Sequence, residues 1–397
     1  AQIDQGTLDS ALLAIADAVE AQTDEIMAAN QLDLDKSGDY NVPQTMIDRL
    51  TLTPSRISQM AEGVRQVASI ESPVGSVIET ITRPNGLVIE KRAVPFGVIG
   101  IIFEARPNVT IDAGVLCLKT ANATILRGGK EAFHTNQIIV SIMRNTLETL
   151  GITPDAIQLV EVLDRDMVGV LLHQREYIDV VIPRGGAGLI RRVVDESSIP
   201  VIETGSGVCH TFVDEYANLD MALEIAINAK VQRPSVCNSM ETLLVHQAVA
   251  AEFLPRLDVA LQEYGVRIHG DNAVAQYMGN TIPLTDNSFN TEYNDMDLNV
   301  RIVDTLEEAI DHVNLYSTHH SEAIVTDEPM RAKVFMNLVD CSTVYHNAST
   351  RFTDGFEFGF GAEIGISTQK LHARGPMGLQ ALTSYKYFVF GEGQVRK

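Results

Sequence analysis

From residue 94 onward the chain alternates between short apolar runs and amphipathic helical stretches. The short runs are apolar throughout, which is typical of strands that are covered on both faces. Such strands, when helices separate them, indicate a parallel sheet, and right-handed crossovers then give a doubly wound domain. The expected strands cover residues 97–103, 123–126, 157–162, 178–182, 201–203 and 211–213, with helices at 110–120, 135–150, 166–174 and 187–198.

A second alternation of the same kind begins near residue 240. Its expected strands cover residues 241–246, 300–304, 322–326 and 343–347, and its expected helices cover 248–264, 305–316 and 328–338. A chain of 397 residues, 45% of them hydrophobic, is long enough for two cores. The sequence therefore predicts an α/β protein with two doubly wound domains.

A polar, β-rich stretch at residues 77–93 precedes the first alternation and is broken by Pro84-Asn85-Gly86. This pattern predicts a long hairpin, and residues 384–390 have the composition of a strand that joins it. A hairpin this polar is not stable alone. We therefore expect it to pair with another subunit, as an oligomerisation arm.

The charge balance limits the kinds of partner that this chain binds. Acidic residues number 52 against 30 basic ones, and the formal net charge is −22. This balance argues against nucleic acids and anionic membranes, because both require a basic face. No apolar stretch reaches the roughly 18–20 residues that span a bilayer, and the first residues show no signal-peptide pattern.

The chain has four cysteines, at positions 117, 209, 237 and 341, and no C-x-x-C pair. They show no metal-ligand spacing, so we expect no metal site and a reduced, cytoplasmic protein. Cys117 lies on an apolar helical face and Cys341 precedes a strand, so both are expected to be structural. Cys209 follows a glycine-rich turn and is a candidate to face a site.

Cys237 lies in a polar run between a helical pattern and a strand-like run. Lys230 and Arg233 precede it, and nearby cations favour the thiolate, which is the nucleophilic form. The alternative is a small buried residue without chemistry. Asn238, which follows it, is either an amide donor or a turn residue. Cys237 is thus the candidate nucleophile of an acyl-transfer or aldehyde enzyme.

Two glycine turns at strand ends are candidates for phosphate binding. Gly185 and Gly186 follow the strand at 178–182 and open a helix, where backbone amides can approach a phosphate. Arg127 and Lys130 flank a Gly-Gly turn after another strand, and an arginine can bind phosphate with two parallel bonds. The alternatives are a glycine turn without a ligand and a charged strand end in solvent.

Six motifs taken together resemble the γ-glutamyl phosphate reductases (glutamate-5-semialdehyde dehydrogenases), a branch of the aldehyde dehydrogenase superfamily. The resemblance covers nearly the whole chain. The motifs are Arg-Pro-Ser-Val-Cys-Asn at 233–238, Glu-Ala-Arg-Pro-Asn-Val at 104–109, Ile-Leu-Arg-Gly-Gly-Lys at 125–130, Ile-Pro-Arg-Gly-Gly-Ala-Gly at 182–188, Asn-Ala-Ser-Thr-Arg-Phe-Thr-Asp-Gly at 347–355 and Gln-Lys-Leu-His-Ala-Arg-Gly-Pro-Met-Gly-Leu at 369–379.

This resemblance implies the reduction of L-glutamate 5-phosphate to L-glutamate 5-semialdehyde and phosphate, the second step of proline biosynthesis from glutamate. Cys237 matches the nucleophile of the family. A thiolate attacks an acyl phosphate readily, and the resulting thioester remains reactive toward hydride. The Cys237 backbone N–H and the Asn108 side chain are candidates to stabilise the oxyanion.

A rival reading is an NAD(P)-dependent aldehyde dehydrogenase that hydrolyses its thioester. Glu203 matches the hydrolytic base of the superfamily, but an acyl-phosphate reductase requires phosphate, not water, at the thioester. Glu203 is therefore not assigned to catalysis. A rival from another class is an inactive assembly subunit that binds the kinase of the preceding step.

The resemblance also implies the cofactor. Many NAD-using relatives carry a glutamate three residues after a lysine at this strand end, whereas this chain has Arg127 and Lys130. Two cations suit a 2′-phosphate, so NADPH is expected. Gly185 and Gly186 match the turn over the pyrophosphate, and Glu292 matches a ribose-binding glutamate.

The charges of Arg233 and Arg351 make both residues candidates to bind the substrate, although Arg351 and its neighbours can equally cap a turn. The expected partners are this small substrate, the preceding glutamate kinase and a second copy of the chain, in a homodimer or larger homo-oligomer. The expected domains are an NADPH-binding domain at 1–205, to which 361–382 return, a catalytic domain at 206–360, and an oligomerisation hairpin at 73–95 and 383–397.

Overall fold

The computed structural model describes residues 3–40, 44–104, 106–164 and 166–396. The outer limits of the predicted domains, residues 1 and 397, lie outside the described residues. The chain divides into two compact units. The first contains the chain up to Thr204, Gly359–Gly365 and the chain from Pro376 onward, and the second contains Gly205–Phe358 and Ile366–Gly375.

The segment at 366–375 departs from the expected division, which placed all of 361–382 with the first domain. Ile366 accepts a hydrogen bond from the backbone N–H of Gly205 over 3.0 Å. Lys370 and Arg374 form ion pairs with Asp340 at 2.6 and 2.7 Å. These contacts attach the segment to the second unit, and its sequence alone does not reveal such distant partners.

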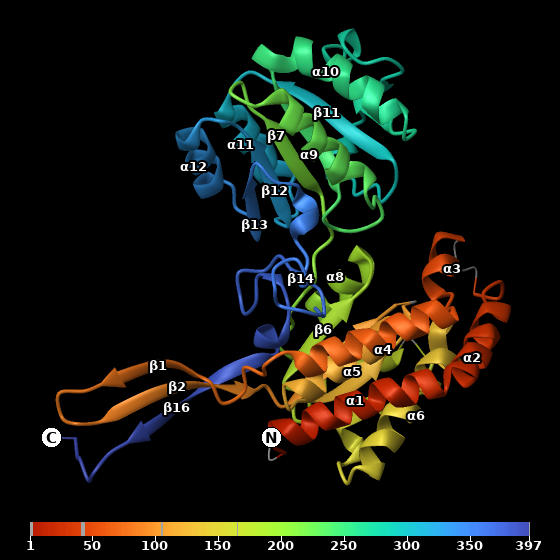
Figure 1. Ribbon diagram of the computed structural model, residues 1–397, viewed down its shortest axis with the longest axis vertical. Coiled ribbons are helices and arrows are strands. Elements are labelled where there is room, and N and C mark those ends of the chain that lie inside the picture. Colours follow the sequence, from red (N-terminus) through yellow and green to blue (C-terminus); the bar gives the residue numbers. More distant parts are fainter. Residues whose placement is uncertain (1–2, 41–43, 105, 165, 397) are drawn as a thin grey trace. The chain divides into compact units, whose positions relative to one another are not determined.

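The first unit is built on a four-stranded parallel sheet with the order β5-β4-β3-β6 (Figure 1). Its strands are β3 (Val98–Phe103), β4 (Ala123–Arg127), β5 (Ile157–Leu159) and β6 (Val180–Arg184). The predicted strand at 201–203 is only a single bridge between Val201 and Val181. The predicted strand at 211–213 forms part of the sheet of the second unit. The sequence placed it with the first series of strands because a local pattern does not specify which sheet a strand joins.

Helices cover both faces of this sheet. On one face α5 contacts β3 and β4, and α1, α4 and α6 pack around it. On the other face α7 and α8 bury Leu172 and Val193 against Ile102 and Val181 of the strands. The helices are α1 (Gln5–Ala21), α2 (Thr23–Asp35), α3 (Gln44–Leu50), α4 (Pro54–Ser69), α5 (Pro107–Lys119), α6 (Phe133–Thr149), α7 (Asp166–Leu172) and α8 (Ala187–Glu196).

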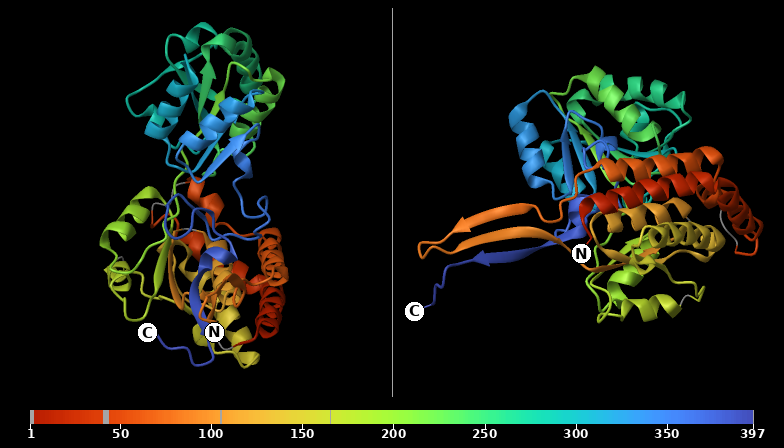
Figure 2. Two further views of the ribbon diagram at one scale, coloured as in Figure 1. Left: turned by 90° about the vertical axis from the view of Figure 1, so that its left-hand side faces the viewer. Right: turned by 60° about the horizontal axis from the view of Figure 1, so that its bottom comes forward.

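A separate three-stranded antiparallel sheet also belongs to the first unit. Strands β1 (Val77–Thr82) and β2 (Val88–Pro95) form the expected hairpin, and β16 (Thr383–Phe390) pairs with β2 along its length. In Figure 2 these strands run side by side away from the helices of their own unit. Tyr385 and Tyr387 remain about half exposed on it, so this arm leaves apolar surface uncovered.

The second unit contains a seven-stranded parallel sheet with the order β10-β9-β11-β8-β7-β12-β13. Its strands are β7 (Cys209–Val213), β8 (Met240–His246), β9 (Arg267–Gly270), β10 (Ile282–Pro283), β11 (Asp297–Val303), β12 (Ser321–Val325) and β13 (Thr343–His346). Its helices are α9 (Leu219–Val231), α10 (Gln247–Gln262), α11 (Leu306–Tyr316) and α12 (Pro329–Leu338).

Successive residues of each central strand in this sheet enter different cores. Val213 and Val245 pack with α9 and α10, whereas Phe212 and Leu244 pack with α11 and α12. Figure 1 shows these helix pairs on opposite faces of the sheet. Both faces are therefore covered, which explains why the strands are apolar throughout.

The described part of the chain contains no helix that combines the length and the apolar character needed to cross a membrane.

Candidate active site

Cys237 lies in a turn of the second unit, between the end of α9 and the start of β8. The turn is closed by a hydrogen bond of 3.0 Å from the Ser239 backbone N–H to the Val236 carbonyl. The Cys237 side chain is half-buried, whereas the other three cysteines are buried. It is therefore the cysteine that a dissolved substrate can reach most readily.

The other thiols are poor nucleophiles because they are buried. Burial raises the pKa of Cys117 to about 12. Burial, with the charges of nearby carboxylates, also raises the pKa values of Cys209 and Cys341 well above that of a free thiol. These shifts agree with the structural roles expected for Cys117 and Cys341.

Lys230 forms a buried ion pair that the sequence did not predict. Its side chain is fully buried at the end of α9, and its Nζ lies 2.8 Å from Oε2 of Glu241 on β8. The position of Lys230 on the helix directs its ammonium into the core of the unit, and the expected effect of this lysine on the Cys237 thiolate stays a prediction.

Arg351 supplies a positive charge that the sequence did not place beside the thiol. Its Nε donates to Oε1 of Gln232 over 2.7 Å, just before the cysteine turn. Burial and the neighbouring charge of Arg233 lower the pKa of Arg351, and the charge of Cys237 opposes that shift. The structure thus brings Arg233, Arg351 and Cys237 into one electrostatic cluster.

The segment before β7 holds the other side of the turn. The Cys209 thiol donates to the Cys237 carbonyl over 3.2 Å. Gly207 lies so close that an added Cβ would stand 1.4 Å from the same carbonyl oxygen. Gly207 belongs to the glycine-rich turn before Cys209, and nothing local in the sequence shows that it shares this space with a residue 30 positions away.

Glu292 belongs to this same group. Its Oε1 accepts a hydrogen bond of 2.8 Å from the backbone N–H of Gly207. One oxygen of the carboxylate therefore fixes the segment that supports Cys237. The expected ribose contact of Glu292 stays a prediction.

In the first unit, the expected cofactor residues lie at the ends of β4 and β6, which flank β3 in the sheet. The register places Arg127 beside Ile102 and Arg184 beside Phe103. The Arg127 guanidinium is buried and donates to the carbonyls of Gly128, Leu163 and Asp164. It therefore contacts backbone oxygens at the position where the sequence predicted a phosphate.

Lys130 begins a short 3-10 helix, η1 (Lys130–Ala132), just after β4. Its Nζ lies over the ring of Tyr40, 4.3 Å from the ring centre. The face of an aromatic ring attracts a cation, so Tyr40 holds the Lys130 side chain at this strand end.

Gly185 and Gly186 form the turn between β6 and α8, as predicted. The backbone N–H of Gly186 donates to Oε2 of Glu104 over 2.8 Å, and an added Cβ on Gly185 would meet that carboxylate at 2.7 Å. An oxyanion therefore already lies at the N-terminus of α8, where amides and the helix dipole favour negative charge.

Asn108 lies in the first turn of α5, and its side-chain nitrogen donates to Oδ2 of Asp112 over 3.1 Å. Burial raises the pKa of Asp112 to about 6, against the opposing effects of Asn108 and Arg184. Asn108 thus belongs to the first unit, whereas Cys237 belongs to the second. The expected role of Asn108 at the oxyanion stays a prediction.

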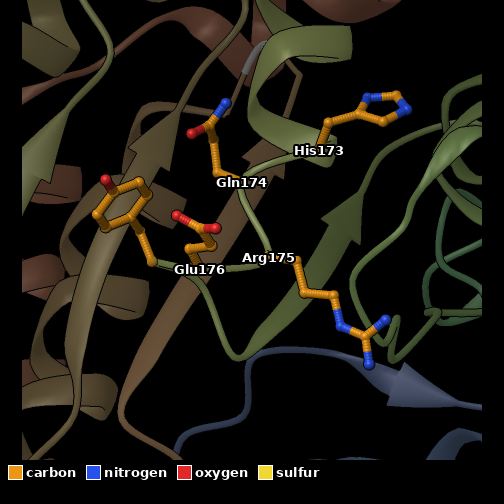
Figure 3. Close-up of a pocket in the computed structure, with 5 residues that line it drawn as sticks. His173, Gln174, Arg175 and Glu176 are labelled. Carbon is orange, nitrogen blue, oxygen red and sulfur yellow. The ribbon is translucent and has the colours of Figure 1, made fainter.

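A surface hollow of about 590 Å³ lies elsewhere in the first unit and is lined by His173, Gln174, Arg175, Glu176 and Tyr177. These residues are consecutive, and the side chains labelled in Figure 3 point in different directions. Since they do not converge on one point, the hollow has no arrangement suited to catalysis.

Comparison with known proteins assigns the chain to a family. The model of the aldehyde dehydrogenase family matches residues 3–282, more than half of the chain. The γ-glutamyl phosphate reductase of Thermobifida fusca is 52% identical over 396 residues, which cover 100% of this chain and 95% of that protein. The enzyme of the same name from Moorella thermoacetica is 54% identical over 389 residues, which cover 98% of this chain and 93% of that protein.

The chain belongs to the γ-glutamyl phosphate reductases. The crystal structure of the γ-glutamyl phosphate reductase of Thermotoga maritima has a TM-score of 0.97 and 44% identity, and covers 100% of this chain and 96% of that one. An acetylating aldehyde dehydrogenase of Geobacillus thermoglucosidasius shares the fold, with a TM-score of 0.70 at 16% identity and coverage of 100% and 94%. The predicted aldehyde dehydrogenase-like α/β class is therefore confirmed.

Proposed function

We propose that this chain reduces L-glutamate 5-phosphate with NADPH to L-glutamate 5-semialdehyde and phosphate, the second step of proline biosynthesis from glutamate. The observation that carries the proposal is a half-buried thiol beside two arginines, on a chain whose full-length relatives are named γ-glutamyl phosphate reductase. These names do not favour a hydrolytic aldehyde dehydrogenase.

Cys237 is the nucleophile in this proposal. Its thiolate attacks the acyl carbon of the substrate, a carbon–sulfur bond forms, and the bond to the phosphate oxygen breaks as phosphate departs. The Cys237 backbone N–H and the Asn108 amide are the proposed donors to the developing oxyanion. Arg233 and Arg351 neutralise charged groups of the substrate, because their guanidinium groups match the geometry of phosphate and carboxylate.

Aldehyde dehydrogenases use nicotinamide cofactors, and NADPH, which supplies the hydride that reduces the thioester, is the proposed cofactor here. Two features of the first unit support the binding of phosphate groups. The Gly186 backbone N–H at the N-terminus of α8 already donates to the Glu104 carboxylate, and the Lys130 side chain lies just after β4. Gly185 and Gly186 are assigned to the pyrophosphate, and Arg127 and Lys130 to the 2′-phosphate. Glu292 is assigned to the ribose.

The first unit is accordingly proposed as the NADPH-binding domain and the second as the catalytic domain. The three-stranded arm is proposed to join two copies of the chain, since Tyr385 and Tyr387 leave apolar surface exposed on it. A homodimer or larger homo-oligomer in the cytoplasm, with the preceding glutamate kinase as a further partner, completes the proposal.

The reverse reaction tests this function. Purified protein is supplied with glutamate semialdehyde and NADP⁺, and NADPH formation is followed with and without phosphate. We expect turnover only with phosphate, and none above background for Cys237→Ser. Continuous turnover without phosphate would support the hydrolytic alternative, and Glu203→Gln would then identify its base.

A further inference from the structure

Asn238 follows Cys237 directly, and its side chain is only 4% exposed. Its amide nitrogen donates to the Thr353 carbonyl over 2.9 Å and to the Arg351 carbonyl over 3.3 Å. These acceptors lie 115 and 113 positions further along the chain. One side chain therefore joins the cysteine turn to the segment that carries Arg351.

The peptide of the turn is held by two further side chains. Thr350 donates its hydroxyl to the Asn238 carbonyl over 2.8 Å, and the Cys209 thiol donates to the Cys237 carbonyl over 3.2 Å. The carbonyls of Cys237 and Asn238 thus accept hydrogen bonds from side chains of two different parts of the chain. This leaves the turn little freedom to rotate.

The segment that receives Asn238 is itself anchored. The Thr353 hydroxyl lies 2.6 Å from that of Ser321 and 2.8 Å from that of Tyr345. Thr353 and Ser321 are fully buried, and Ser321 and Tyr345 belong to the neighbouring strands β12 and β13. Asn238 therefore bonds to a segment that is itself anchored to the sheet through Thr353.

The orientation of the Asn238 amide follows from its surroundings. Its nitrogen faces two carbonyl oxygens, and within the described part of the chain its Oδ1 has no hydrogen-bond partner. An aspartate of the same shape would have to direct an oxygen at those carbonyls. The site therefore requires the amide specifically, because a carboxylate cannot donate.

We propose that Asn238 is a positioning residue of the reaction: it fixes Cys237 and Arg351 relative to each other, so that the thiol and the guanidinium act on one bound substrate. This inference rests on the proposed function, in which Cys237 attacks the substrate and Arg351 binds it. Asn238 itself does not touch the reacting atoms. It acts through the backbone on either side.

The test compares Asn238→Ala and Asn238→Asp with the wild type in the phosphate-dependent assay, at a temperature where all are folded. Misplacement of reacting groups by about 1 Å costs roughly 10²-fold, so we expect kcat/KM to fall roughly 10–100-fold with a raised KM. Alkylation of Cys237 by iodoacetamide should change in rate as well. A fall in Tm with unchanged kcat, KM and alkylation rate would show a structural role only and overturn the proposal.

The link to Arg351 is tested separately by combining Asn238→Ala with Arg351→Ala. If Asn238 acts partly through Arg351, the double variant should lose less than the product of the two single losses, because linked residues are not additive. Independent, multiplying losses would overturn this link.

Two variants of Thr350, which change fewer atoms, provide the test if Asn238→Ala does not fold. Thr350→Val removes the hydroxyl that bonds the Asn238 carbonyl, and Thr350→Ser restores it. We expect the valine variant to change KM and the alkylation rate and the serine variant to recover both. Equal behaviour of the two variants would count against the proposal.

A wild type without phosphate-dependent activity would refute the proposed function instead. The alkylation rates of Cys237 would still report whether Asn238 and Thr350 orient the thiol.

Discussion

The two turns that are expected to do chemistry are held in different ways. In the first unit, the Gly185–Gly186 turn bonds one side chain, the Glu104 carboxylate, through the backbone N–H of Gly186 at the N-terminus of α8. In the second unit, the turn at Cys237 is held through two consecutive carbonyls and a buried amide, by side chains from several elements. In the proposed function, the first turn exchanges the Glu104 carboxylate for a cofactor phosphate, whereas the second turn keeps the Cys237 nucleophile in place.

This difference has a consequence for substitutions. A changed residue at the cofactor turn should alter the affinity for one ligand and leave the rest of the unit intact. A changed residue behind Cys237 should displace the turn, because its contacts are buried and closely packed. The following variants test that contrast.

Gly207→Ala should have the largest effect. An added Cβ would stand 1.4 Å from the Cys237 carbonyl oxygen, so backbone must move. Overpacking of this kind costs about 1–3 kcal/mol or more, and the displaced turn should lose roughly 10²-fold in kcat/KM. Urea unfolding and the phosphate-dependent assay measure the two effects.

Gly63→Ala is the matched control, since it lies in α4 and an added Cβ meets no atom within 4 Å. It should stabilise the protein by up to about 1 kcal/mol, because alanine favours helix more than glycine does. Gly207→Ala with normal activity would show that the close approach to Cys237 does not matter.

Arg351→Ala should raise the KM for the phosphorylated substrate roughly 10–100-fold, because a guanidinium that binds an anion is lost. Steady-state kinetics in the forward direction measure this value. Arg256→Ala is the control, since this arginine forms a surface ion pair with Asp220, and its KM should not change. An unchanged KM in Arg351→Ala would remove this residue from the substrate site.

Lys130→Ala should weaken the binding of NADPH roughly tenfold and leave the binding of NADH almost unchanged, because only NADPH carries the 2′-phosphate. The KM values for both cofactors measure the effect. Lys91→Ala is a suitable control, since Lys91 lies over Tyr385 on the arm. Equal losses with NADPH and NADH would place Lys130 away from the 2′-phosphate.

Asp112→Asn should give a smaller, pH-dependent effect. Burial raises the pKa of Asp112 to about 6 in the folded protein, above the value of about 3.9 for an exposed aspartate. Its contribution to stability is therefore fully present below about pH 4 and is lost as the pH rises through about 6. The asparagine variant should not show this loss, and urea midpoints across that range would reveal it. Identical pH profiles would contradict the assigned shift.

The sequence predicted the fold well because its signals are local. Strands that are apolar throughout, the hairpin of β1 and β2 and the glycine turn after β6 all depend on residues close in the chain. The predicted strand at 211–213 does form, yet it joins the sheet of the second unit, because its neighbours in that sheet lie far along the chain.

The surroundings of Cys237 were predicted less well, for a physical reason. Lys230 is near Cys237 in the chain, but its place on α9 directs it to Glu241. The contacts that hold the turn come from Cys209, Thr350 and Thr353, which lie 28 to 115 positions away. Spacing along the sequence does not encode such contacts, so the sequence could name candidates such as Cys237, Arg233 and Arg351 but not the contacts that join them.

The most direct test of the central claim is to look for the thioester on Cys237. Protein is mixed with glutamate semialdehyde and NADP⁺ in the absence of phosphate, and the products are analysed by absorbance and by mass spectrometry of the digested chain. The account predicts one equivalent of NADPH, a γ-glutamyl adduct on the peptide that contains Cys237, and renewed turnover when phosphate is added. Continuous turnover without phosphate, or a burst without an adduct on Cys237, would contradict it.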